Sequence, residues 1–172
     1  MKNIDDLVDS AADLAERGLS KGEIADELNV SRETASCAMA DLLSKQGEDV
    51  DLTIGIEKAG APLATTVARE LDTDLGTYAP SKHQWDDDES EAADGSFSRN
   101  FAQIRDRDCY VVDDTITSGN TMTETVEAIQ QQGGNPIACV VLADKRGIEE
   151  IHGVPVYSLL QVIRVGSDQS SA

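Results

Sequence analysis

The sequence predicts an α/β protein, with a parallel sheet and flanking helices, preceded by a small all-α domain. Short runs rich in Val and Ile recur along the chain, and most end at a polar or glycine-containing loop. Such continuous apolar runs are typical of strands buried on both faces of a parallel sheet. Segments with helical spacing of apolar residues lie between these runs, which favours βαβ units. The chain before Gly47 shows only helical patterns, so we expect a separate helical unit there.

The composition indicates a folded protein adapted to high salt. The chain has 172 residues, enough for one α/β domain and a small appendage. It carries 33 acidic residues against 14 Lys and Arg, a formal net charge of −19. A hydrophobic fraction of 40%, arranged in periodic segments, argues against disorder. At high salt the screening length falls to about 3 Å at 1 M, which removes the self-repulsion of so acidic a chain.

Nothing in the sequence indicates a metal, a membrane or an oxidising compartment. The three cysteines, Cys37, Cys109 and Cys139, lack metal-ligand spacing, and two of them lie in apolar strand-like runs. The chain starts without a hydrophobic signal region and has no stretch long enough to span a membrane. We therefore expect a cytoplasmic protein with no membrane partner, no cofactor and no metal site of its own.

The first 36 residues are predicted to form three short helices joined by tight turns. A capping box, Ser20-x-x-Glu23, opens the second helix, and Ser31 caps the third. This arrangement predicts a helix-turn-helix, whose third helix enters the DNA major groove with its N-terminal residues at the base edges. Arg32 suits a bidentate contact with guanine. The predicted DNA contacts are Ser31, Arg32, Glu33, Thr34 and Ser36.

A trihelical cap with no nucleic-acid role is the alternative for this region. Residues 1–46 carry ten acids against five Lys and Arg, whereas most DNA-binding modules are basic. High salt weakens this objection, because counterion release then contributes less to DNA binding. We assign residues 1–37 to the DNA-binding domain, residues 38–165 to the α/β domain and residues 166–172 to a disordered tail.

The junction between the two predicted domains has no linker. A helical pattern continues from Cys37 to Gln46 and ends at Gly47, although separate domains are normally joined by an exposed polar connection. Either one helix is continuous across the boundary, or a segment is missing from the chain near residues 36–38. A missing segment would show as a Cα–Cα step much longer than the roughly 3.8 Å of a trans peptide.

The most informative stretch runs from Cys109 to Thr121, where an apolar strand ends in two acids and a loop of Thr, Ser, Gly and Asn leads into a helix. Open α/β sheets bind ligands at the carboxyl ends of their strands. Backbone N–H groups at a helix N-terminus suit a phosphate, whereas carboxylates repel phosphate but accept hydrogen bonds from sugar hydroxyls. We predict a phosphorylated sugar or nucleotide ligand, bound by Asp113, Asp114, Thr117, Ser118, Gly119, Asn120 and Thr121.

Three other loops bear on this ligand. The tight loop ending Lys58-Ala59-Gly60 precedes a helix with an early Pro, and it supplies a cation and a close backbone approach. Residues 80–96 form an acidic insertion of the length of a lid or a disordered loop. Lys145 or Arg146 either lines the same crevice or lies on a surface loop. Mg²⁺ would reach Asp113 and Asp114 only through a bound diphosphate, whereas a monophosphate needs no metal.

The pattern Asp-Asp-x-x-Thr-x-Gly-x-Thr, from Asp113 to Thr121, resembles the phosphoribosyl-pyrophosphate signature of type I phosphoribosyltransferases. Thr115 departs from that family's preference for an aliphatic residue or Ser. With residues 31–36 and 55–60, the chain resembles the orotate-phosphoribosyltransferase-like transcriptional regulators of halophilic archaea, the GfcR type, which control sugar catabolism. The resemblance implies a type I phosphoribosyltransferase-like fold with a hood loop, and a homodimer that reads a pseudo-palindromic promoter site. Members of that group look longer between the recognition helix and the ligand domain.

The hood loop departs from the enzymes of that family. In orotate phosphoribosyltransferases the matching loop carries several basic residues and closes over the diphosphate. Here Lys82 and His83 are followed by four consecutive acids, residues 86–89, which would repel a diphosphate. We therefore assign no catalytic residue, and we expect a regulator whose crevice senses a phosphorylated metabolite.

Two other functions stay open from the sequence. The first is an active phosphoribosyltransferase of the orotate or purine type, which would release pyrophosphate from phosphoribosyl pyrophosphate. The second is a nucleotide-storing or structural protein with no DNA role. Pyrophosphate release favours the first, and failure to bind promoter DNA at molar KCl favours the second.

Overall fold

The computed structural model describes residues 32–81, 95–98 and 103–162. The first two predicted helices, Ser31, most of the acidic insertion and the predicted disordered tail lie outside the described residues. The described elements follow one another as α3 (Arg32–Ser44), β1 (Leu52–Ile56), α4 (Gly60–Leu71), β2 (Asp74–Ala79), β3 (Ser96–Phe97), β4 (Asp108–Ile116), α5 (Asn120–Gln131), β5 (Asn135–Asp144), β6 (Glu150–Ile151) and β7 (Val154–Gln161).

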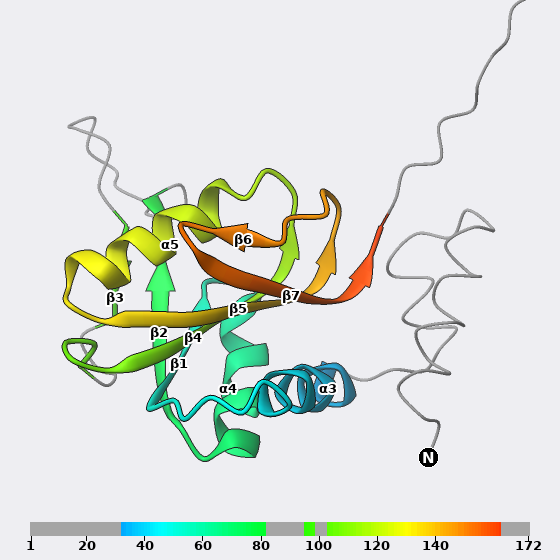
Figure 1. The fold of residues 1–172 in the computed structure, drawn as a ribbon, viewed down its shortest axis with the longest axis horizontal. Helices are drawn as coiled ribbons and strands as arrows, with labels where there is room; N and C mark the ends of the chain where they lie inside the picture. The colour runs from blue at the N-terminus through cyan, green and yellow to red at the C-terminus, as the bar shows by residue number, and fades with distance from the viewer. Residues whose placement is uncertain (1–31, 82–94, 99–102, 163–172) are drawn as a thin grey trace, which may run out of the picture.

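The sheet has the order β3-β2-β1-β4-β5-β7-β6 (Figure 1). Its five central strands are parallel, and only the two-residue strands β3 and β6 pair antiparallel at the edges. Strand β1 lies between β2 and β4, so the carboxyl ends of β1 and β4 are neighbours. This confirms the predicted α/β class, and it places the loops after β1 and β4 at one edge of the sheet.

Helices cover both faces of the sheet, as the near-continuous apolar strands require. Helices α3 and α4 lie on one face and α5 lies on the other (Figure 1). Alternate residues of β4 serve the two layers, since Val112 packs with Met39, Leu63 and Val67 while its neighbour Val111 packs with the α5 side. Four α5 residues are buried on that side, namely Met122, Thr125, Val126 and Ile129.

Helix α3 runs without a break through residues 36–38. A continuous helix is therefore the form that this chain takes at the junction, and the predicted boundary between residues 37 and 38 falls inside α3. The helix is held against α4 and the sheet by an apolar side on which Met39 and Leu43 are fully buried. After Ser44 the chain turns, and Gly47 has a φ of 74°, a left-handed conformation that favours glycine.

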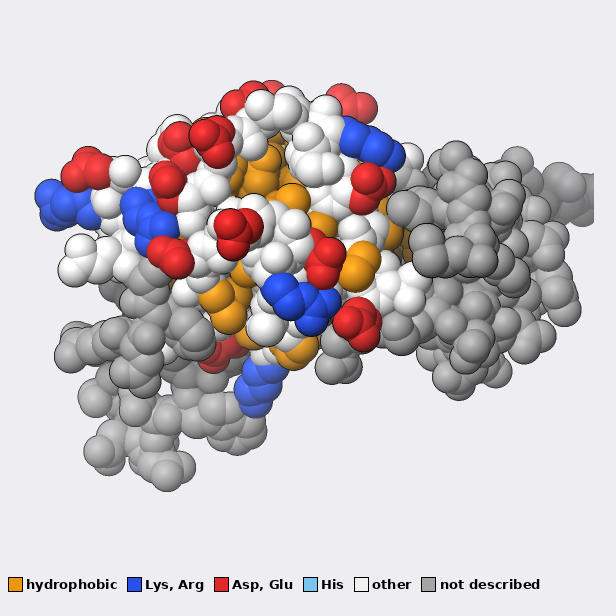
Figure 2. Space-filling view, turned by 90° about the horizontal axis from the view of Figure 1, so that it is seen from below, with side chains coloured by type: hydrophobic (Ala, Val, Ile, Leu, Met, Phe, Trp, Pro, Cys, Tyr) orange, Lys and Arg blue, Asp and Glu red, His pale blue; other side chains and the backbone are white. Residues whose placement is uncertain are grey.

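The α3–α4 side of the molecule carries charges of both signs (Figure 2). Acidic and basic side chains alternate over this surface, with hydrophobic atoms showing between them. Arg69 of α4 joins the two helices, because its Nη2 lies 3.2 Å from Glu33 Oε1 and 3.0 Å from Glu70 Oε1. All three side chains are well exposed, so the pairs contribute little to stability.

The last long strand, β7, begins just before a proline. Pro155 is the second residue of β7, and the parallel ladder with β5 starts only at Val156. A residue without an N–H is therefore kept out of that ladder. The short strand β6 was not predicted, because two residues carry no period by which a strand is recognised.

Candidate functional site

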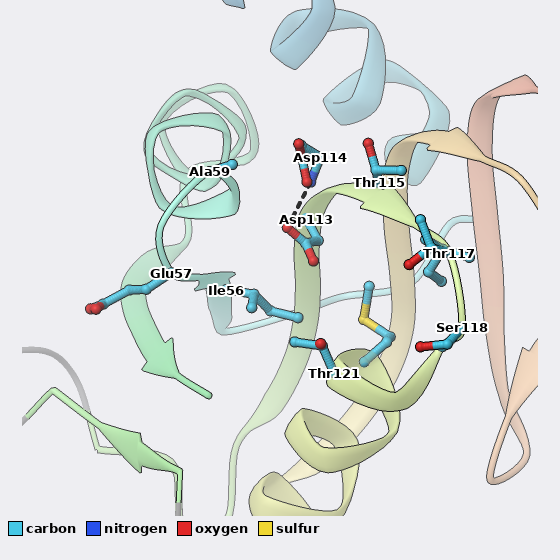
Figure 3. Close-up of a pocket in the computed structure, with 12 residues that line it drawn as sticks. Ile56, Glu57, Ala59, Asp113, Asp114, Thr115, Thr117, Ser118 and Thr121 are labelled. Carbon is cyan, nitrogen blue, oxygen red and sulfur yellow. Dashed lines mark hydrogen bonds between the residues drawn. The ribbon is translucent and has the colours of Figure 1, made fainter. Parts of the chain in front are cut away.

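A cavity lies at the carboxyl ends of β1 and β4 in the described structure. It is lined by Ile56, Glu57 and Ala59 on one side and by residues 113–119 on the other, with Thr121 and Met122 contributed by α5 (Figure 3). Topology explains this position, since two parallel neighbours deliver their loops to the same edge of the sheet. The two stretches singled out from the sequence therefore form one pocket.

Gly60 allows the two loops to approach each other closely. A Cβ atom at this position would stand 2.5 Å from the carbonyl oxygen of Val112 and 2.9 Å from Cα of Asp113. No side chain fits in that space. The N-terminus of α4 therefore packs directly against Val112 and Asp113 of β4. A displacement of either segment requires the other to move.

The acid pair lies inside β4, near its carboxyl end, and not in the loop after the strand as predicted. Asp113 Oδ1 accepts a hydrogen bond of 2.8 Å from the backbone N–H of Asp114 (Figure 3). Both carboxylates are half-buried, whereas Thr117 and Ser118 are exposed. Asp113 thus fixes the backbone inside β4, three residues before the strand ends at Ile116.

The loop turns into α5 at Gly119, whose φ of 84° is in the left-handed region. Asn120 N–H points toward Ser118 Oγ over a long 3.4 Å, and no side chain at the N-cap bonds to the first turn of the helix. Backbone N–H groups and the positive end of the helix dipole face the pocket, which suits an anion. Half-buried carboxylates beside them suit the hydroxyl groups of a sugar.

Glu57 is a pocket residue that sequence reasoning missed. Its Oε1 accepts a hydrogen bond of 2.9 Å from Thr77 Oγ1 on β2, which holds the side chain at the rim. The Glu57–Lys58 peptide bond is cis. The sequence offered a signal, since Glu57 directly follows β1, but one more acid among 33 is not conspicuous.

The other predicted ligand residues lie around this pocket in different ways. Asp113, Asp114, Thr117, Ser118, Gly119, Thr121 and Ala59 line it, and Gly60 is buried behind it. Asn120 is exposed at the start of α5. Lys58 is exposed beside a neighbouring shallow groove, which also contains Pro62 and Leu75.

A third loop, after β5, stands next to the pocket without lining it. Asp144 is buried at its start and accepts hydrogen bonds from the backbone N–H groups of Arg146, Gly147 and Ile148. Lys145 and Arg146 are exposed and are not among the residues that line the main pocket.

The residues predicted to contact DNA are only partly described. Arg32 is the first residue of α3, and Glu33 and Thr34 are exposed on its first turn. Ser36 is fully buried, so its side chain does not reach a nucleic acid from this position. Ser36 is packed inside because it lies one helical turn before Ala40 and Met39, on the side that contacts α4.

The described residues contain no group of three or more His, Cys, Asp and Glu side chains arranged to hold a metal ion. Within the same part of the chain no helix is long and apolar enough to cross a membrane. Cys109 and Cys139 are buried in the sheet, and burial raises the pKa of each thiol to about 12. These thiols are protonated core groups.

Comparison with known proteins agrees with this architecture. The phosphoribosyl transferase domain model matches residues 22–169. The transcriptional regulator GfcR of Haloarcula marismortui is 70% identical over 212 aligned positions, which cover 99% of this chain and 100% of that protein. Because 212 positions exceed the 172 residues of this chain, the alignment includes positions without a counterpart here.

Solved structures share the fold at low identity. Orotate phosphoribosyltransferase of Mycobacterium tuberculosis in complex with inorganic phosphate superposes with a TM-score of 0.61 at 20% identity, covering 81% of this chain and 76% of that one. The same enzyme with 5-phospho-alpha-D-ribosyl 1-diphosphate gives a TM-score of 0.58 at 18% identity, covering 76% and 72%. The chain therefore belongs to the phosphoribosyl transferase domain family and, within it, to the GfcR group of transcriptional regulators.

Proposed function

We propose that the pocket between β1 and β4 is a sensor for a phosphorylated sugar or nucleotide, and that its occupancy controls binding of the protein to promoter DNA. The observation that carries this proposal is the close packing of Gly60, at the start of α4, against Asp113 of β4. This packing brings the loop after β1 to a cavity that also contains the N-terminus of α5 and two half-buried carboxylates. A phosphate at Thr117–Thr121 and sugar hydroxyls at Asp113 and Asp114 satisfy both parts.

The mycobacterial enzyme of the same fold supports this class of ligand, since it has been solved with inorganic phosphate and with a phosphorylated ribose diphosphate. The relatives named as transcriptional regulators support a role of the pocket in controlling DNA binding. A ligand changes DNA binding only if it has different affinities for two arrangements of the protein. In a homodimer those arrangements differ in the spacing of the two DNA-binding heads, and hence in fit to a pseudo-palindromic site.

For the DNA contacts we retain Ser31, Arg32, Glu33 and Thr34. Ser36 is left out of this set because it is fully buried. The role also fits a cytoplasmic protein that acts at promoters of sugar-catabolism genes. Residues 1–37 supply the DNA-binding part of this function and residues 38–165 the sensing part.

We further propose that the pocket binds without catalysis. The support is the acidic insertion after β2, where orotate phosphoribosyltransferases place basic residues. The phosphoribosyl-pyrophosphate signature from Asp113 to Thr121 and the fold favour an active phosphoribosyltransferase as the second candidate. Release of pyrophosphate from phosphoribosyl pyrophosphate with orotate or a purine base, in molar KCl, would decide for that candidate.

The proposal is tested by a thermal-shift screen of phosphorylated sugars and nucleotides in molar KCl, followed by promoter gel shifts with each compound that stabilises the protein. Mass action raises the unfolding temperature in the presence of a ligand that binds only the folded state. We expect at least one sugar phosphate to raise it and to change promoter affinity. Stabilisation without any change in promoter affinity would refute the regulatory link.

Two substitutions separate the two sites. Arg32→Ala is expected to abolish promoter binding and to leave ligand affinity unchanged, whereas Asp114→Asn is expected to abolish the ligand response and retain DNA binding. Lys45→Ala is the matched control for the first, because Lys45 is an exposed cation paired with Asp41 at the other end of α3.

Asp72→Asn is the control for the second substitution. Asp72 is an exposed carboxylate at the C-terminus of α4, in a left-handed conformation that Asn also tolerates. Identical defects in Arg32→Ala and Asp114→Asn would show that DNA binding and ligand binding are not separable.

A further inference from the structure

Asp144 is a buried carboxylate outside the pocket. It is the last residue of β5, its exposed fraction is 2%, and it lies beside Ile116, the last residue of β4. Burying a carboxylate is unfavourable unless hydrogen bonds compensate for the lost water. Its partners therefore indicate what it does.

The partners of Asp144 are three consecutive backbone N–H groups of its own loop. Oδ1 accepts from Arg146 at 2.8 Å and from Gly147 at 3.0 Å, and Oδ2 accepts from Ile148 at 2.7 Å. Hydrogen bonds to an ionised acceptor are the stronger kind. The carboxylate thus folds residues 145–148 around itself and fixes the direction in which the loop leaves the sheet.

This loop contacts the end of β4 and the start of α5, one point on each side of the loop that joins them. The backbone N–H of Lys145 donates to the carbonyl oxygen of Ile116 at 3.1 Å. The side chain of Ile148 lies over Gly119, where its Cδ1 is 3.0 Å from the position that a Cβ atom would take. Gly119 is the N-cap of α5, so Ile148 packs against the residue that aims the helix N-terminus at the pocket.

We propose that Asp144 is a positioning residue of the ligand site: its carboxylate holds residues 145–148, and Ile148 in turn holds Gly119 in the conformation that binds phosphate. This inference rests on the proposed function of the pocket. Asp144 itself does not touch the ligand, because it is absent from the pocket walls and its oxygens face its own loop.

The sign of the effect separates this role from simple electrostatics. Asp144→Asn removes a negative charge near a bound phosphate, which through Coulomb interaction alone would leave affinity unchanged or strengthen it. An Asn side chain also replaces one acceptor oxygen by a donor, so it cannot accept all three N–H groups. Loss of the loop geometry weakens binding instead. The expected loss of affinity is about tenfold, which corresponds to the net contribution of one hydrogen bond.

The test is calorimetric titration of the full chain with ribose 5-phosphate and with inorganic phosphate in molar KCl. We expect Asp144→Asn and Ile148→Ala each to weaken binding of both probes by about tenfold. Because both substitutions act through one loop, their effects are not expected to add. The affinity of the double variant is expected to be close to that of the weaker-binding single variant. Hydrogen exchange at the amides of Gly119 and Asn120 is expected to quicken in all three.

The matched control is Ile137→Ala. Ile137 is a half-buried isoleucine near the start of β5, the strand that ends at Asp144. The substitution removes the same side-chain atoms as Ile148→Ala without touching the loop. It is expected to lower stability and leave both affinities unchanged. If Asp144→Asn does not fold, Ile148→Ala decides the question by the same criteria.

Two outcomes would overturn the inference, and they are distinguishable. Wild-type affinities in folded Asp144→Asn and Ile148→Ala would remove the positioning role and leave the proposed function standing. Absence of binding by the wild-type protein to either probe would contradict the proposed phosphate site, and the positioning role with it.

Discussion

The two ends of the sheet use their acidic residues differently. At the amino ends of the strands, Asp74 Oδ2 is paired with Arg107 Nη2 at 2.7 Å, and Asp108 Oδ1 accepts a hydrogen bond of 2.6 Å from the side chain of Asn135. At the carboxyl ends, Asp113 accepts a hydrogen bond from the backbone N–H of Asp114, its neighbour in β4, and Asp144 accepts from backbone N–H groups of the loop after β5. The first arrangement joins neighbouring segments, whereas the second determines the shape of loops beside a cavity.

This difference shows how a site is recognised in a chain with 33 acids. An acidic residue is uninformative by itself here, but the partner of its carboxylate is informative. The side-chain partners of Asp74 and Asp108, far from the pocket, indicate a role in stability alone. Backbone partners at the carboxyl ends indicate that the acid sets loop geometry, so its loss is expected to change ligand binding as well as stability.

The largest effect is expected from two crowded glycines, one at each end. Gly60→Ala places a Cβ 2.5 Å from the Val112 carbonyl oxygen, and Gly134→Ala places one 2.6 Å from Ile104 Cγ2. Each is expected to lower the free energy of unfolding by about 1–3 kcal/mol through overpacking. Only Gly60→Ala is expected to abolish binding of ribose 5-phosphate, measured by calorimetry at a temperature where both variants are folded. Equal ligand affinities in the two variants would erase the distinction between the ends.

Salt is expected to act on the whole molecule. With a net charge of −19, the folded chain repels itself in dilute buffer, and molar KCl screens this repulsion. The urea midpoint of unfolding is therefore expected to rise continuously from dilute buffer to molar KCl, as followed by circular dichroism. A midpoint that is independent of KCl would contradict the interpretation of the composition as salt adaptation.

A smaller effect is expected from Arg107→Ala at the amino end. Arg107 Nη2 donates to the carbonyl oxygen of Asp51 at 2.8 Å and to Asp74 Oδ2. Because the side chain of Arg107 is 23% exposed while that of Asp74 is 63% exposed, the loss of stability is expected to be about 1 kcal/mol. Ligand affinity is expected to match the wild type. A weakened affinity would show that the amino end also shapes the pocket.

The last effect is absent at neutral pH and is expected only at alkaline pH. Burial raises the pKa of the thiols of Cys109 and Cys139 from 9.0 to about 12, so the folded state holds these protons more tightly than the unfolded state. Their contribution to stability is complete below pH 9.0 and is lost as pH rises toward about 12. Unfolding by urea across this range is expected to become easier, and Cys139→Ala is expected to flatten the dependence. The same slope in that variant would assign it to other groups.

Much of the fold follows from the sequence because the strands are buried on both faces. Runs such as Ile137–Ala143 need no partner information to be recognised, and the predicted strand lies within β5. The helices predicted after Gly60 and after the loop that follows the acid pair are α4 and α5.

The site was predictable where local pattern sets geometry. The loop between β4 and α5 was predicted because Gly119 and small polar residues precede a helix, but it is shorter than predicted, since β4 continues through the acid pair to Ile116 and α5 begins at Asn120. Glu57 was not recognised because its position depends on Thr77 from another strand. Asp144 was not recognised because its role depends on the folded loop, which brings three backbone N–H groups to its carboxylate. The burial of Ser36 was also not foreseen, since a helix with apolar residues before and after it gives no clear facing side.

The central claim, that the pocket binds a sugar phosphate through the acid pair and the N-terminus of α5, is tested most directly by calorimetric titration of ribose 5-phosphate in molar KCl. The wild-type chain and Asp72→Asn are expected to give saturable heat with equal affinity, and Asp114→Asn is expected to give none. No heat with the folded wild-type chain, or equal heat with Asp114→Asn, would contradict the claim.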